Sequence, residues 1–168
     1  MTATDGYTCS CCGDTHRDVP FAWHVPAPAQ WSERYEGRED SVLDGELCMI
    51  ERRLFFVHGV VEIPVVDADD PFHWGVWVSL SESNFDRTIE LWEQEGRESE
   101  PAMFGWLSVD LLGYLPSTIN LKTNVHTQPV GNRPLVELEP TGHPLAVEQR
   151  EGITLARVHE LAALMMRG

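Results

Sequence analysis

Short apolar runs separated by polar residues fill the middle of the chain and predict adjacent β-strands. Between positions 46 and 66 three such runs, rich in β-branched and aromatic residues, follow one another, a pattern typical of neighbouring strands. The three runs are Leu47–Ile50, Leu54–Val57 and Val60–Val66. A fourth run, His73–Leu80, is apolar at both odd and even positions, so we expect a central strand that is covered on both faces.

Apolar residues at helical spacing predict two helices. The first stripe consists of Phe85, Ile89 and Trp92. Ser81 or Ser83 can cap the helix that carries it. The second stripe consists of Leu155, Val158, Leu161, Ala162 and Met165, and it predicts a helix over Ile153–Met166 with Thr154 as its cap. Because each helix has one apolar side, both are expected to pack on the sheet.

The remaining elements complete an α+β pattern. Further strands are predicted at Met103–Val109, Thr118–His126 and Leu135–Leu138. The acidic stretch Val25–Leu47 reads as a surface connection, in which residues 28–35 can form a short helix. Arg52 and Arg53 stand where a hairpin turn is needed, and they are not favoured turn residues, so the register of that hairpin stays open.

Grouped strands with one helix between them and another at the end predict an α+β fold with a largely antiparallel sheet. The 168 residues fit a single domain over 1–168, with a Cys/His knuckle segment at 1–24 and an α+β body at 46–168. The chain contains no internal repeat and no low-complexity segment.

The net charge of the chain disfavours some classes of binding partner. The formal net charge is -15 at pH 7, which disfavours nucleic acid and anionic membranes and suits a basic or neutral protein or small molecule. No apolar stretch approaches the roughly 20 residues of a membrane span, and the first residues lack the pattern of a secretory signal. We therefore expect a cytoplasmic protein whose thiols stay reduced.

The cysteines at the start of the chain predict a metal site. Cys9 and Cys12 have the spacing of a zinc knuckle, His16 follows closely, and Cys48 can supply the fourth ligand of a structural zinc ion. Cys11 can replace either knuckle thiol. In one alternative, Cys48 is a buried small hydrophobe and the Cys cluster is an unligated turn. In another, three protein ligands leave a position for water, as in catalytic zinc sites.

A second candidate site is polar. If Thr118–His126 is a strand, its two-residue period places one set of hydrogen-bonding side chains on a single face, namely Asn120, Lys122, Asn124 and His126. Together with Arg133, His143 and Glu148 they can form a pocket for an anionic or polar small molecule. The alternative is a solvated outer face of a half-buried strand. The Trp and Phe residues are expected to lie in the core, because they fall on predicted strand and helix faces.

Several distinctive strings resemble an uncharacterised bacterial family named domain of unknown function twenty-one ninety-nine. These strings are Tyr7–Gly13 with His16, Phe72–Glu82 with Asn84 and Phe85, Phe104–Leu107, Leu121–Thr123, His143–Ala146, and Glu148 with Gln149. The resemblance covers most of the chain and implies a shared fold, but it implies no activity. The chain departs from it at Arg52 and Arg53, where similar sequences look more like Asp-Gly.

Two hypotheses about function follow. In the first, the protein is a small binding or interaction module with a structural zinc site. In the second, it is an enzyme, such as a hydrolase, with a site built from Lys122, His126, Arg133 and His143. The sequence contains neither a phosphate-binding glycine loop nor a Gly-x-Ser-x-Gly nucleophile motif.

Overall fold

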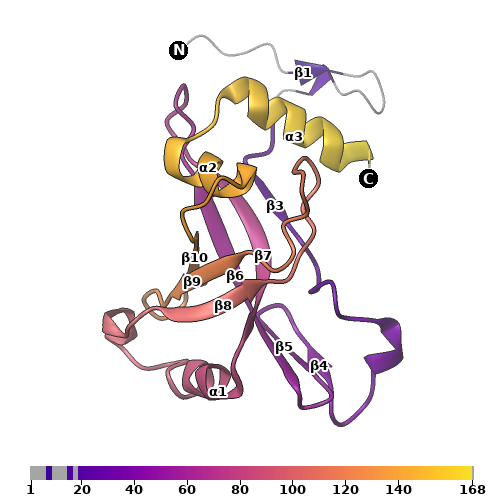
Figure 1. Ribbon diagram of the computed structural model, residues 1–168, viewed down its shortest axis with the longest axis vertical. Helices are drawn as coiled ribbons and strands as arrows, with labels where there is room; N and C mark the ends of the chain where they lie inside the picture. Colours follow the sequence, from indigo (N-terminus) through magenta and orange to yellow (C-terminus); the bar gives the residue numbers. More distant parts are fainter. Residues whose placement is uncertain (1–6, 9–14, 17–18, 168) are drawn as a thin grey trace.

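Two long antiparallel strands form the spine of the protein (Figure 1). The structure, a computed structural model, describes residues 7–8, 15–16 and 19–167. Strand β6 (Leu54–Ile63) pairs with β7 (Phe72–Leu80) from Phe55 opposite Leu80 to Ile63 opposite Phe72. The two runs predicted at Leu54–Val57 and Val60–Val66 therefore belong mainly to one strand, because the chain stays extended through Gly59.

Five strands close into a small barrel. Strands β8 (Met103–Leu107), β9 (Lys122–His126) and β10 (Leu135–Leu138) extend the sheet from β7 with antiparallel pairings. The last of them then pairs with β6 in parallel, with Leu135 opposite Val60. Most pairings in the sheet are antiparallel, as predicted, and the parallel contact between β10 and β6 is the one that closes the ring.

Three further strands extend the sheet beyond the barrel. Strand β5 (Leu47–Ile50) pairs with the first half of β6, and β4 (Val42–Leu43) pairs with β5. Strand β3 (Ala22–His24) runs parallel to β7 and was not predicted. The segment between β3 and β4 carries a single 3-10 turn, η1 (Glu33–Tyr35), within the range where a short helix was expected.

Helices cover both ends of the barrel (Figure 1). Helix α1 (Glu82–Glu90) begins after Ser81, whose side chain accepts a hydrogen bond from the amide of Asn84, so Ser81 is the cap of the two that the sequence offered. It is followed by the 3-10 turn η2 (Arg97–Ser99). At the opposite end lie α2 (Pro144–Glu151) and α3 (Leu155–Arg167). Helix α2 was not predicted, and α3 confirms the expected C-terminal helix. No described helix is both long and apolar enough to cross a membrane.

The first part of the described chain is a two-stranded ladder. Strand β1 (Tyr7–Thr8) pairs antiparallel with β2 (Thr15–His16). In Figure 1 this ladder lies beside α3, whereas β4 and β5 lie at the other end of the molecule. Cys9 and Cys12 fall outside the described residues.

The core fills the barrel and one outer face of the spine. Consecutive residues of β6 and β7, which point to opposite faces of the sheet, are mostly buried. The prediction of a strand that is covered on both faces is therefore confirmed for β7. Trp74, Trp77, Phe72 and Phe85 are buried as expected. Trp92, Phe104 and Trp106 are about two-fifths exposed, so the prediction that these three lie in the core is wrong. Phe104 and Trp106 stand on the exposed face of β8, and Trp92 lies in the turn that follows α1.

Two local predictions are corrected by backbone geometry. Strand β9 begins at Lys122 and not at Thr118, because Asn120 adopts a left-handed conformation (φ 68°) that interrupts an extended chain. The hairpin between β5 and β6 turns at Glu51 and Arg52, with φ values of 54° and 52°, and the Arg53 amide donates to the Ile50 carbonyl at 3.0 Å. The turn thus has the mirror-image geometry that suits hairpins, formed without glycine.

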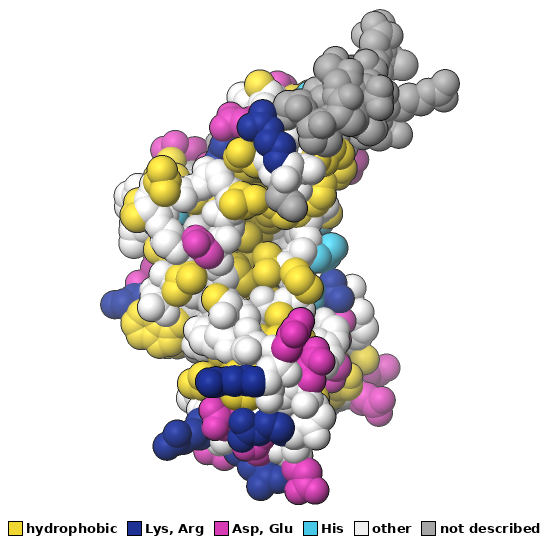
Figure 2. Space-filling view, turned by 90° about the vertical axis from the view of Figure 1, so that its right-hand side faces the viewer, with side chains coloured by type: hydrophobic (Ala, Val, Ile, Leu, Met, Phe, Trp, Pro, Cys, Tyr) yellow, Lys and Arg dark blue, Asp and Glu magenta, His cyan; other side chains and the backbone are white. Residues whose placement is uncertain are grey.

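Charged groups of both signs share the outer surface near β4 and β5. In Figure 2 basic and acidic side chains lie intermixed over this end of the molecule, and apolar side chains show across its middle. Arg38 exemplifies the pattern, since its guanidinium lies 2.7 Å from the Asp40 carboxylate and 3.6 Å from that of Glu51.

Candidate functional site

A cavity of about 610 Å³ lies at the α1 end of the barrel. Its walls come from five separate parts of the chain: the turn before β5, strand β6, the end of α1 with the following loop, strand β8, and strand β9 with the β9–β10 connection. The apolar part of its lining consists of Val57, Leu91, Trp92, Met103, Val125, Val130 and Pro134. The charged part consists of Glu46, Glu93, Arg97 and Arg133. The mouth of a small barrel is thus both apolar and charged.

Arg97 is a buried cation in the wall of this cavity. Only 8% of the residue is exposed. Its Nε donates to the Gln128 carbonyl at 2.7 Å, and Nη1 donates to the Trp92 carbonyl at 2.9 Å. Nη2 donates to the carbonyls of Pro129 and Asn132 at 3.2 and 3.1 Å.

These hydrogen bonds give Arg97 a structural role, but they do not neutralise its positive charge, because all the acceptors are backbone carbonyls. They tie the loop after α1 to the β9–β10 connection, so they hold two walls of the cavity together. A buried charge is tolerated only where polar groups surround it, and here the carbonyl dipoles do so. In the part of the chain that the structure describes, no carboxylate lies within ion-pair distance of this guanidinium.

Arg133 lies on the β9–β10 connection and is held there by Glu46. Its Nε lies 3.0 and 3.2 Å from the two carboxylate oxygens, and its Nη2 lies 2.9 Å from one of them. This bidentate pair fixes the plane of the guanidinium, and the Glu46 hydrogen bonds raise the pKa of Arg133. The pair joins residues 87 positions apart in the chain.

His58 lies behind this ion pair, on β6. Its Nδ1 is 3.0 Å from the Gly45 carbonyl, so Nδ1 carries the proton and Nε2 is a bare acceptor. Nε2 is buried and has no hydrogen-bond partner among the described groups. The ring stacks on Trp77 with centroids 4.8 Å apart. Burial lowers the pKa of His58, and the nearby Arg133 charge lowers it further.

A second imidazole stands beside His58 because Gly75 has no side chain. The rings of His24 and His58 lie edge to face, 5.9 Å apart. A Cβ on Gly75 would lie 2.2 Å from the His24 Nδ1 and 3.0 Å from the His58 Nε2. Glycine at this position therefore makes room for both rings on the outer face of β7.

The predicted polar face of β9 exists, but it lies outside the cavity. Lys122 is exposed and His126 half-buried, and both project from the outside of the barrel. The Lys122 Nζ lies 6.0 Å from the centre of the Trp106 ring, and the His126 Nε2 lies 3.2 Å from the Glu137 carboxylate. Of the four residues proposed as a polar site, only Arg133 lines the cavity at the α1 end.

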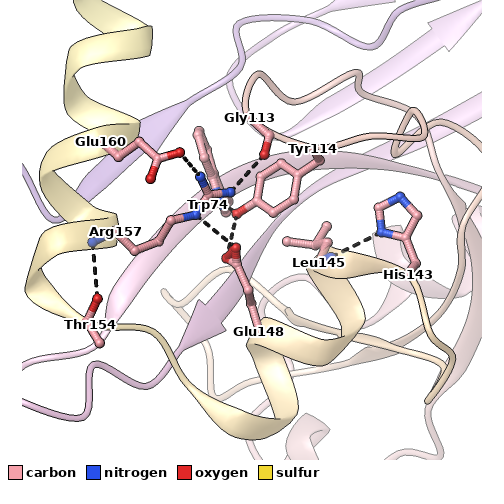
Figure 3. Close-up of polar contacts among 9 residues, drawn as sticks. All are labelled: Trp74, Gly113, Tyr114, His143, Leu145, Glu148, Thr154, Arg157 and Glu160. Carbon is pink, nitrogen blue, oxygen red and sulfur yellow. Dashed lines mark hydrogen bonds and ion pairs between the residues drawn. The ribbon is translucent and has the colours of Figure 1, made fainter.

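His143 serves as the cap of α2 (Figure 3). Its Nδ1 accepts a hydrogen bond from the Leu145 amide at 3.1 Å, and its Nε2 donates to the Pro116 carbonyl at 2.8 Å. Both ring nitrogens are therefore used within the fold. A histidine before a proline is an unusual start signal for a helix, which explains why α2 was not predicted.

Glu148 belongs to a buried network between α2, α3 and the barrel (Figure 3). Its carboxylate accepts from the Tyr114 hydroxyl at 3.2 Å and from the Arg157 Nε at 3.1 Å. Tyr114 in turn accepts from the Trp74 indole at 3.0 Å. Burial raises the pKa of Glu148 while Arg157 opposes the shift. With every member paired, this network joins the helices to the sheet and leaves no group to act on a ligand.

The described residues contain only part of the predicted metal site. Cys48 lies on β5, fully buried, and burial raises the pKa of its thiol to about 12. His16 lies on β2, and Cys9 and Cys12 are outside the described residues. Among the side chains that the structure describes, no group of three His, Cys, Asp or Glu residues is placed to hold a metal ion.

The fold and the cavity define a small α+β barrel protein with an open site at one end. The model of the family DUF2199, described as an uncharacterized protein conserved in bacteria, matches residues 8–153. The chain belongs to this family, which confirms the resemblance seen in its sequence. No curated protein and no solved structure matches the chain. The family description names no activity, so we infer the function from the chemistry of the site.

Sequence reasoning found Arg133 but missed the residues that face it. Glu46 and Arg97 stand in acidic, irregular segments and carry no motif. His58 did give a signal, because it is a polar residue inside an otherwise apolar run, and such a residue is buried with its strand. The signal points to a buried imidazole but not to the cavity beside it.

We predict that His58 makes stability fall as the pH drops below about 6.5, the ordinary pKa of histidine. The folded protein holds this ring neutral, whereas the unfolded chain binds a proton there, so the stabilisation is complete above that pH and is lost below it. Urea unfolding of the protein and of His58→Gln at pH 7.5 and 5.5 measures the effect. The variant should lose less stability between the two pH values than the parent does, and an equal loss in both would contradict the prediction.

Proposed function

We propose that this protein is a binding module for a small molecule and that the cavity at the α1 end of the barrel is its site. The cavity volume of about 610 Å³ falls within the roughly 300–1,000 Å³ of ordinary ligand pockets. Such pockets occur in the mouths of β-barrels, with an apolar lining and a few fixed polar groups. The proposal depends on one observation: a cavity of ligand size, with an apolar lining and fixed charged groups, lies at one end of a closed barrel.

The rigidity of the walls supports binding as the task of this site. Arg97 ties two loops with hydrogen bonds to carbonyls, and Glu46 holds Arg133 in a fixed plane. Groups whose geometry is fixed before a ligand arrives lose less conformational entropy on binding.

The enzyme hypothesis finds less support. Its four residues do not converge, since Lys122 and His126 face outward and His143 caps a helix. Arg133 has no acid–base function at neutral pH, because its guanidinium stays charged. Among the described residues that line the cavity, no nucleophile lies within hydrogen-bond reach of a base, which is the geometry that catalysis needs.

A cavity-filling variant tests the proposal. Thr88→Trp places a large side chain in the α1 wall, and Thr141→Trp adds the same side chain at an exposed turn away from the cavity. We expect fragments found by ligand-observed NMR to bind the protein and Thr141→Trp alike and to bind Thr88→Trp at least about tenfold more weakly.

Circular dichroism and thermal unfolding check that both variants fold. If Thr88→Trp does not fold, Gln128→Trp fills the cavity from the opposite wall. The proposal is wrong if the fragments bind the filled variant as well as they bind the parent, or if no fragment binds at all.

We also propose a structural zinc ion in the knuckle of Cys9, Cys12 and His16, with a thiolate of Cys11 or Cys48 as the fourth ligand. The spacing of these residues supports it, as does the pairing of Tyr7 with His16, which brings the two flanks of the knuckle together. Cys48 would have to leave its buried, protonated state to bind zinc, so Cys11 is the better fourth ligand.

Elemental analysis of purified protein tests the zinc proposal. We expect an equimolar amount of zinc, lost together with stability in Cys9→Ser and Cys12→Ser and retained in Cys48→Ser. Protein that holds no metal after purification and binds none on addition of zinc would refute the site. Loss of zinc from Cys48→Ser alone would identify Cys48 as the fourth ligand.

A further inference from the structure

Arg133 presents an unused edge of its guanidinium at the wall of the cavity. Glu46 occupies the edge formed by Nε and Nη2. For Nη1 the structure gives no hydrogen bond within the described residues, so the edge formed by Nη1 and Nη2 is still available. Two parallel N–H groups on one edge match the two oxygens of a carboxylate.

We propose that the ligand of this cavity is an amphipathic carboxylate, with its charged head on the open edge of Arg133 and its apolar body against the barrel interior. This inference rests on the proposed function and names its ligand class. A carboxylate in this position would make the second bidentate pair of Arg133, and Glu46 would keep the guanidinium in the plane that the first pair sets.

The charges around the cavity favour an anion. Glu46 balances Arg133, whereas Arg97 is satisfied only by carbonyl oxygens and keeps an uncompensated positive charge. The remaining carboxylate of the lining, Glu93, is exposed and therefore well hydrated. A buried cation attracts an anion more strongly than a hydrated surface carboxylate repels it, because the effective dielectric constant is lower inside.

The lining carries two arginines against two carboxylates, so it lacks the strong negative charge of the whole chain, whose formal net charge is -15. The overall charge slows the approach of anions, so a general attraction cannot explain their binding here. Recognition must come from the two guanidinium groups themselves, and it should disappear when Arg133 is changed.

The apolar lining supplies the other half of the recognition. Val57, Leu91, Met103 and Val125 are buried and point a continuous apolar surface at the cavity. Removing apolar ligand surface from water at this lining favours binding in proportion to the area that is buried. A head group alone, such as acetate, would make no use of this surface.

Three probes of the same chain length separate the head groups. Hexanoate, hexanol and hexylammonium share one apolar body and differ in charge. We expect hexanoate to bind at least about tenfold more tightly than either of the others, with NMR shift changes at Leu91, Met103 and Val125. Acetate should bind far more weakly than hexanoate.

Arg133→Gln should remove the preference for hexanoate and leave the affinity for hexanol unchanged. Arg150→Gln, which deletes an equal charge from the exposed side of α2, controls for net charge and should bind like the parent. If Arg133→Gln does not fold, Arg133→Lys keeps the charge without the two-pronged edge and should lose most of the preference.

The outcomes separate the two proposals. Equal binding of hexanoate and hexanol, or tighter binding of hexylammonium, overturns the carboxylate assignment while the cavity remains a binding site. Binding of fragments in the cavity with no binding of any of the three probes also overturns it. If neither fragments nor probes bind, both the ligand class and the proposed function are wrong.

Discussion

The fold depends on one close contact, the parallel approach of β10 to β6. The Val60 amide donates to the Pro134 carbonyl at 2.9 Å, and the strands can come this close because Gly59 has no side chain: a Cβ there would lie 2.7 Å from the Val136 Cγ2 and 3.1 Å from the Pro134 oxygen. A closed barrel has no exposed edge at this seam. Because β10 is fixed here, the connection that precedes it is held over the end of the barrel, where it forms one wall of the cavity.

Two arginines then determine the shape of that wall. Arg97 offers its N–H groups to carbonyls of the loop after α1 and of the β9–β10 connection, while Arg133 reaches back to Glu46 before β5. Loops otherwise move more than the elements they join. Here two guanidinium groups join three connections around the apolar lining of the cavity: the turn before β5, the loop after α1 and the β9–β10 connection. The two groups are satisfied in different ways. Arg97 is hydrogen-bonded to backbone carbonyls, and no carboxylate among the described residues balances its charge. Arg133 is paired with Glu46 through the edge formed by Nε and Nη2.

The local pattern of the sequence predicted much of the fold. β5 has the predicted bounds, β7 is covered on both sides, and Ser81 caps α1, because alternation, burial and capping are properties of neighbouring residues. Strand β3 and helix α2 escaped prediction, since a three-residue strand owes its existence to β7 and α2 starts at an unusual cap. The cavity at the α1 end was not predicted from the sequence either. Its charged residues come from distant segments with no motif in common, and only the closure of the barrel brings them together.

The central claim is that the barrel closes between β6 and β10, and amide hydrogen exchange at Val60 tests it most directly. A hydrogen bond inside a closed barrel opens only when the whole domain unfolds. The Val60 amide should therefore exchange as slowly as the amides shared by β6 and β7, with a free energy of opening equal to that of global unfolding. Exchange as fast as that of an exposed loop amide would show that the seam is open and would contradict the account.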